Sequence, residues 1–96
     1  MDLTSTKYLR KLAAFAEAHG FAITAGGAHS GHNPGSMHYL GRAIDVSVHG
    51  KTDAEVEALI QRAGECGFRA LDERHRLPGE AVWTGPHVHI EDRDGL

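Results

Sequence analysis

The most informative part of the chain is the segment Ser36-Met37-His38-Tyr39-Leu40-Gly41-Arg42-Ala43-Ile44-Asp45. A second segment near the end of the chain, His87-Val88-His89, adds two further histidines. Two histidines and one carboxylate are a usual set of zinc ligands, and three protein ligands leave a fourth position for water, as at catalytic zinc sites. If the two segments converge in the fold, the sequence predicts a metal-dependent hydrolase.

Residues 42–48 and 87–91 both alternate between apolar and polar side chains, which is typical of strands. Because successive side chains of a strand point to opposite faces, the aliphatic residues of 42–48 face the core and Asp45 faces away from it. The same alternation places His87 and His89 together on the polar face of their strand. If the two strands are neighbours, Asp45 and His89 can bind the same ion.

His38 is the expected third ligand, because Gly41 allows the chain to bend between His38 and Asp45. Zinc held by two imidazoles and one carboxylate lowers the pKa of a bound water towards about 7. Such a water is a nucleophile suited to attack on an amide carbonyl.

The rest of the chain predicts two helices and several short strands. Apolar residues recur at helical spacing over 5–19, and the pattern Thr52-Asp53-Ala54-Glu55 is a capping box that begins a second helix, ending at Gly67. Further strands are expected over 21–24, 68–71 and 81–83. Two helices and about five strands that need not be parallel predict an α+β fold, with a mostly antiparallel sheet and the helices packed on one face. The polar site would then lie on the other face.

Loops and chain ends complete the expected pattern. Residues 25–35 are rich in glycine, which predicts a loop beside the site, and Pro78-Gly79 predicts a hairpin loop over 72–80. Cys66 is the only cysteine, so no internal disulfide can form, and we expect it to be a small buried residue at a helix end. The acidic end, Glu91-Asp92-Arg93-Asp94, is expected to be solvated.

The length of 96 residues predicts one domain over 1–96. The net charge is −3 and the charges are interspersed, so we expect no nucleic-acid partner. No apolar run approaches the roughly 18–20 residues that span a bilayer. The start, Met1-Asp2-Leu3-Thr4, lacks a secretory signal, which leaves open a cytoplasmic chain, export by another route, or a signal already removed. We expect a monomer.

These motifs resemble those of a known family. The pattern Ser36-x-His38-x-x-Gly41-x-Ala43-x-Asp45 is similar to the signature of the D-Ala-D-Ala carboxypeptidase family of zinc peptidases, which are peptidoglycan peptidases that share the fold of the hedgehog signalling domain. The pattern His87-x-His89 resembles the second motif of that family. The amino-acid sequence of residues 36–45 is most similar to that of the hedgehog branch.

The resemblance implies a hedgehog/DD-peptidase-like fold with Zn²⁺ held by His38, Asp45 and His89. It also implies that His87 polarises the substrate carbonyl or stabilises the oxyanion. His32 falls where the hedgehog branch has an active-site histidine, which implies a further acid–base group at the mouth of the site.

The sequence departs from the family pattern at the general base. Many members carry a glutamate shortly before the last ligand, but residues 83–88 contain no acid. The base is therefore His87, His32 or Glu80, or is missing.

Two further departures concern substrate and calcium. The carboxypeptidases use an upstream arginine to hold the substrate carboxylate, whereas residues 25–35 contain none and Arg42 is expected on the core side. Carboxypeptidase and endopeptidase activity both stay open. The acidic calcium cluster of animal hedgehog domains has no counterpart in residues 24–30, so we expect no calcium site of that kind.

Two functions follow from these expectations. The first is a zinc metallopeptidase that hydrolyses amide bonds of peptidoglycan-type peptides through a metal-activated water. The alternative is a zinc-binding, hedgehog-like recognition module with little or no hydrolysis, which the missing glutamate favours. A peptidoglycan peptide, or another peptide, is the expected partner of either.

Overall fold

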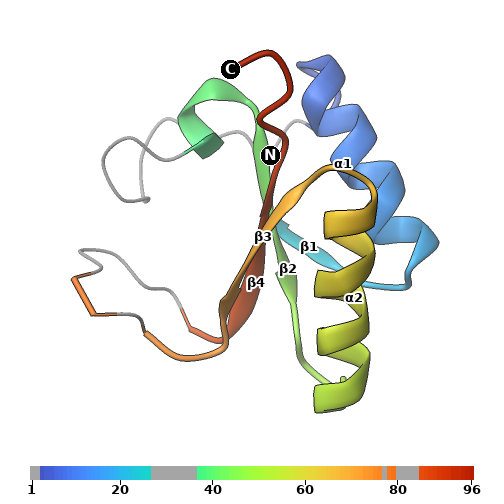
Figure 1. Ribbon diagram of the computed structural model, residues 1–96, viewed down its shortest axis with the longest axis vertical. Coiled ribbons are helices and arrows are strands. Elements are labelled where there is room, and N and C mark those ends of the chain that lie inside the picture. Colours follow the sequence, from blue (N-terminus) through green and yellow to red (C-terminus); the bar gives the residue numbers. More distant parts are fainter. Residues whose placement is uncertain (1–2, 27–36, 77, 80–84) are drawn as a thin grey trace.

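The computed structural model describes residues 3–26, 37–76, 78–79 and 85–96. Two α-helices, α1 (Lys7–Ala18) and α2 (Asp53–Glu65), and a short 3-10 helix, η1 (Met37–Leu40), accompany four strands. The strands are β1 (Ile23–Ala25), β2 (Ala43–Ser47), β3 (Arg69–Glu73) and β4 (His87–Glu91). The predicted α+β class is therefore confirmed (Figure 1).

The four strands form one antiparallel sheet in the order β1-β2-β4-β3. Both α-helices lie on one side of this sheet, and η1 lies on the other (Figure 1). In the register of the sheet, Asp45 of β2 is opposite His89 of β4, and Glu73 of β3 is opposite His87. Three neighbouring strands thus bring polar residues to one region of the sheet.

The core lies between the sheet and the two α-helices. Alternation turns the apolar side chains of β2 and β4 towards the helices, while Asp45 and His89 face the other way. The fully buried aliphatic residues of the core are Leu9, Leu12, Ile44, Val46, Val56, Leu59, Val88 and Ile90. Each such side chain contributes about 1.5–3 kcal/mol when it is fully buried, so this layer fixes the strands that carry the site.

Both helices begin at threonines that cap them. Thr6 Oγ1 accepts a hydrogen bond from the amide of Leu9 at 3.0 Å, and Thr52 with Glu55 forms the predicted capping box. A cap of this kind contributes about 1 kcal/mol. Of the helices in the described part of the chain, none is long and apolar enough to cross a membrane.

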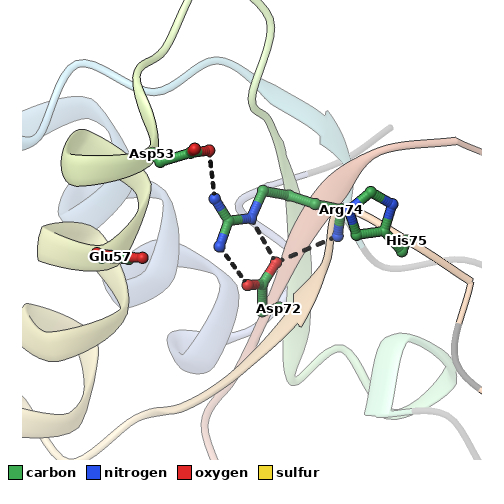
Figure 2. Close-up of a pocket in the computed structure, with 5 residues that line it drawn as sticks. All are labelled: Asp53, Glu57, Asp72, Arg74 and His75. Carbon is green, nitrogen blue, oxygen red and sulfur yellow. Dashed lines mark hydrogen bonds and ion pairs between the residues drawn. The ribbon is translucent and has the colours of Figure 1, made fainter.

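The end of β3 is held by an ion-pair network on the helix side of the sheet (Figure 2). Arg74 Nη2 lies 2.6 Å from Asp72 Oδ2, and Arg74 Nη1 lies 2.8 Å from Asp53 Oδ1 in the first turn of α2. These two carboxylates also line a pocket with Glu57 and His75. The network fixes the backbone on both sides of Glu73, whose side chain points to the opposite face.

Two expectations about the chain between α2 and β4 were wrong. Residues 72 and 73 belong to β3 rather than to a loop, because Asp72 pairs with Val88 and Glu73 with His87 in the sheet. Cys66 is exposed rather than buried, because it caps the end of α2 beyond the buried face of that helix. The expected strand over 81–83 lies outside the described residues.

The acidic end is not fully solvated, contrary to expectation. Glu91 and Asp92 are 4% and 1% exposed. Pairing of β4 with β2 carries the chain past Arg42, whose carbonyl accepts a hydrogen bond from the amide of Asp92 at 2.8 Å. Lys11 of α1 then places its ammonium 3.1 Å from the carboxylate of Asp92. The tail is thereby fixed against α1.

Candidate metal centre

The centre is built on the pairing of β2 with β4. Asp45 and His89 occupy opposite positions in this register, and both point to the face without α-helices. Asp45 Oδ1 lies 3.3 Å from His89 Nδ1. Two of the three predicted ligands are therefore brought together by the sheet itself.

His38 reaches the same point from η1, which precedes β2. The turn from η1 into β2 uses Gly41 at a φ of 63°, a conformation that side-chain-bearing residues rarely adopt. Thr6 packs against this glycine and donates a hydrogen bond from its hydroxyl to the carbonyl of Gly41. As a result His38 Nε2 lies 3.0 Å from Asp45 Oδ1 and 3.1 Å from His89 Nδ1.

The three candidate ligand atoms are His38 Nε2, Asp45 Oδ1 and His89 Nδ1. They form a triangle with sides of 3.0, 3.1 and 3.3 Å. Zinc bonds of about 2.0–2.1 Å in a tetrahedron imply about 3.3 Å between neighbouring ligand atoms. The triangle therefore has the size of one face of a zinc coordination tetrahedron, and these three residues are close enough to hold a metal ion.

Hydrogen bonds on the far side of each imidazole orient the lone pairs inwards. His38 Nδ1 lies 2.9 Å from the carbonyl oxygen of Gly26, and His89 Nε2 lies 2.7 Å from Glu91 Oε1. Because these oxygens only accept, the ring nitrogens that face them carry the protons. In the neutral rings, the lone pairs of His38 Nε2 and His89 Nδ1 then point towards Asp45, which suits a cation among the three.

The site is buried, and its charges are strongly coupled. His38, Asp45 and His89 are 1%, 5% and 7% exposed. Burial raises the pKa of the Asp45 carboxyl, but hydrogen bonds with His38 and His89 lower it by more than burial raises it. This pKa therefore lies well below its ordinary value of 3.8. Burial lowers the pKa of His89, but hydrogen bonds with Asp45 and Glu91 outweigh it, so this pKa lies above 6.5. Both shifts reflect a site that favours positive charge beside Asp45.

A second group of ligand-type residues adjoins the first. His87 Nε2 lies 3.0 Å from Glu73 Oε2 and 3.7 Å from Asp45 Oδ1. Glu73 and His87 are each 8% exposed. His87 Nδ1 lies 2.7 Å from the carbonyl oxygen of Gly85 and therefore donates to it. With Asp45, these residues are likewise close enough to hold a metal ion.

The four predicted residues His38, Asp45, His87 and His89 all meet at this centre. His32 and Glu80, both considered as the base, lie outside the described residues.

Arg42 points elsewhere. Its guanidinium lies 3.7 Å from the ring centroid of Tyr8 and donates hydrogen bonds to the carbonyl oxygens of Asp92 and Asp94. The Arg42 side chain is therefore bound to α1 and to the C-terminal residues.

Sequence reasoning missed Glu73 and Glu91. Glu91 continues the alternation of His87 and His89, so the polar face of that strand could have been extended by one step. Glu73 was hidden by the expectation of a loop, because residues 69–73, Arg-Ala-Leu-Asp-Glu, do not alternate between apolar and polar side chains.

No protein-family model, curated protein or solved structure matches the chain. The geometry of the centre is therefore what bears on function.

Proposed function

We propose that the chain is a zinc-dependent hydrolase of peptide amide bonds. The observation that carries this proposal is the buried triangle of two imidazole nitrogens and one carboxylate oxygen, with sides of 3.0–3.3 Å. Its donor set matches the usual three protein ligands of catalytic zinc, which leave one position for water. His38, Asp45 and His89 would hold the metal.

Zinc, when bound, would polarise the substrate carbonyl and lower the pKa of water at the site towards about 7. The residues of the chain supply orientation. Glu91 and the carbonyl of Gly26 fix the rings of His89 and His38 through their outer nitrogens. Asp45 keeps its negative charge at neutral pH, because its pKa is held below the ordinary value.

Glu73 and His87 form the acid–base pair of the proposed reaction. Glu73 Oε2 and His87 Nε2 are 3.0 Å apart, and His87 Nε2 lies 3.7 Å from Asp45 Oδ1. A carboxylate at this position can accept the proton released when water attacks an amide. The imidazole of His87 can pass that proton to the departing amine. Glu73 thus offers, from the neighbouring strand, the acid that is missing just before His89 in the sequence.

Peptidoglycan-type peptides are the substrates we propose, on the strength of the motif resemblance at residues 36–45 and 87–89. The described residues favour endopeptidase over strict carboxypeptidase activity. Arg42, the one arginine within the motif, is bound to Tyr8 and the tail and does not serve a substrate carboxylate.

The test is cleavage of purified muropeptides by the zinc-loaded chain, followed as release of new amino groups. We expect cleavage by the wild type, none by His89→Ala, and cleavage slower by about 10²–10⁴-fold in Glu73→Gln despite retained zinc. Glu57→Gln, at an exposed position on α2, is the matched control and should stay active.

Other outcomes separate the two functions. A chain that binds zinc and peptide tightly but cleaves nothing is the recognition module. A chain that binds no zinc would contradict both the hydrolase and the recognition module.

A further inference from the structure

Asp45 belongs to two possible ligand groups at once. It forms the triangle with His38 and His89, and it also lies within 4.8 Å of ligand atoms of Glu73 and His87. The second group comes from β2, β3 and β4, so the sheet register alone assembles it. The shared carboxylate raises the question of whether both groups can hold ions.

One ring nitrogen of His87 is turned towards the second group. His87 Nδ1 donates to the carbonyl of Gly85 at 2.7 Å, so in the neutral ring Nε2 carries a lone pair. That lone pair faces Glu73 Oε2 at 3.0 Å. A metal ion can replace the proton that this pair shares when no ion is present, because the nitrogen and the carboxylate oxygen are both ligand atoms. Glu73 and His87 are each 8% exposed, so water competes little for either atom.

The distances suit a metal ion in this place. His87 Nε2 lies 3.0 Å from Glu73 Oε2 and 3.7 Å from Asp45 Oδ1. These values bracket the separation of about 3.3 Å between neighbouring ligands of a tetrahedral zinc ion. Pairs of metal ions in two-metal sites lie about 3.5–4 Å apart. Asp45 belongs to both groups, and a carboxylate has two oxygens with which to serve two ions.

We propose that Asp45, Glu73 and His87 form a second, weaker site for Zn²⁺ beside the first. It is the weaker site because Asp45 is shared with the first ion and because two cations so close together repel. An ion in this second site would hold Glu73 and His87, which removes the acid–base pair from the reaction. Excess zinc therefore inhibits hydrolysis, an effect that rests on the proposed function, whereas the binding itself does not.

The test is a titration of the metal-free full chain with Zn²⁺ against a competing chelator, with bound zinc counted per chain. We expect two binding steps in the wild type and in Glu57→Gln. Glu73→Gln and His87→Gln should each lose the weaker step and keep the tighter one. Circular dichroism spectra of the variants check that each is folded, and two independent variants guard against a folding failure in one.

Three results would overturn the second site. One is a single step in the wild type at every zinc concentration. Another is a weaker step that persists in both variants, which assigns it to histidines elsewhere on the chain. The third is the loss of both steps together in folded variants, which means one shared site.

Muropeptide cleavage across the same titration separates this proposal from the hydrolase. Activity should rise with the first equivalent of zinc and fall as the second binds. Activity with one bound ion and no inhibition leaves the hydrolase standing and rejects the second site. Two bound ions without any cleavage supports the second site and rejects the hydrolase.

Discussion

Asp45 and His89 lie directly opposite each other on β2 and β4, with Asp45 Oδ1 3.3 Å from His89 Nδ1. A slip of one residue between these strands would turn one side chain into the core and destroy the pair. The apolar neighbours on the other face, Ile44 and Ile90, are fully buried and therefore fix this register. The core and the candidate metal centre are two faces of the same strand pairing.

The carboxylate of Glu91 orients His89 and should strengthen metal binding. Its Oε1 accepts a hydrogen bond from His89 Nε2 at 2.7 Å. Loss of such a partner behind a ligand typically costs about 10–100-fold in metal affinity. We expect Glu91→Ala to weaken zinc binding by that factor in a chelator competition, and Asp94→Ala, at an exposed position, to leave it unchanged. Equal zinc affinities in the two variants would show that Glu91 does not contribute to metal binding.

Glu73 should affect turnover and not the first zinc ion. It contacts His87 at 3.0 Å, whereas the proposed tighter site consists of His38, Asp45 and His89. General acid–base groups contribute about 10²–10⁴-fold to rate. We expect kcat of Glu73→Gln to be lower than that of the wild type by a factor in this range, with the first zinc ion retained. Steady-state kinetics together with metal analysis check this, and unchanged kcat would assign the base to another residue.

Gly41 should be required for the position of His38. Its φ is 63°, and a Cβ there would lie 2.6 Å from Thr6 Cγ2, whereas Gly50 has a φ of 74° with open space around it. The left-handed conformation costs a non-glycine residue roughly 1–2 kcal/mol. Gly50→Ala should show only this cost in urea denaturation, and Gly41→Ala should lose more stability and also bind zinc more weakly. Identical behaviour of the two variants would contradict the tight turn between η1 and β2.

The metal-free chain should lose stability on both sides of neutral pH. The pKa of Asp45 is lowered in the fold, because hydrogen bonds with His38 and His89 outweigh burial, so its contribution is complete above the unfolded value of 3.8 and is lost as pH falls through the folded value. The pKa of His89 is raised, because hydrogen bonds with Asp45 and Glu91 outweigh burial, so its contribution is present below 6.5 and is lost as pH rises through the folded value.

Urea denaturation of the metal-free chain across pH measures this effect, since stability depends on the difference in bound protons between the two states. We expect a maximum between the two limbs. Asp45→Asn should flatten the acid limb, and His89→Gln should flatten the alkaline limb. A pH profile that is the same in the wild type and both variants would show that these two groups are not coupled as described.

The sequence was sufficient to predict those residues of the candidate centre whose direction is determined by local alternation along a strand. Period-two patterns in residues 42–48 and 87–91 place Asp45, His87 and His89 on polar faces, and the structure brings these faces together with His38. The capping box at Thr52 was also predictable, because it depends only on neighbouring residues.

The missed residues depend on contacts between distant segments. Glu73 belongs to a strand because it pairs with His87, and Asp92 is buried because Lys11 of α1 and Arg42, just before β2, contact it. Polar segments of this kind look like loops or tails in a sequence, since their partners lie far along the chain. Propensity is overridden there by sheet pairing and ion pairing.

The most direct measurement is an anomalous difference map from crystals of the chain loaded with one equivalent of zinc. Our account predicts one strong zinc peak at bonding distances of about 2.0–2.2 Å from nitrogens of His38 and His89 and an oxygen of Asp45. A zinc peak bound elsewhere, or no retained zinc at all, would contradict the metal centre and with it the proposed hydrolase.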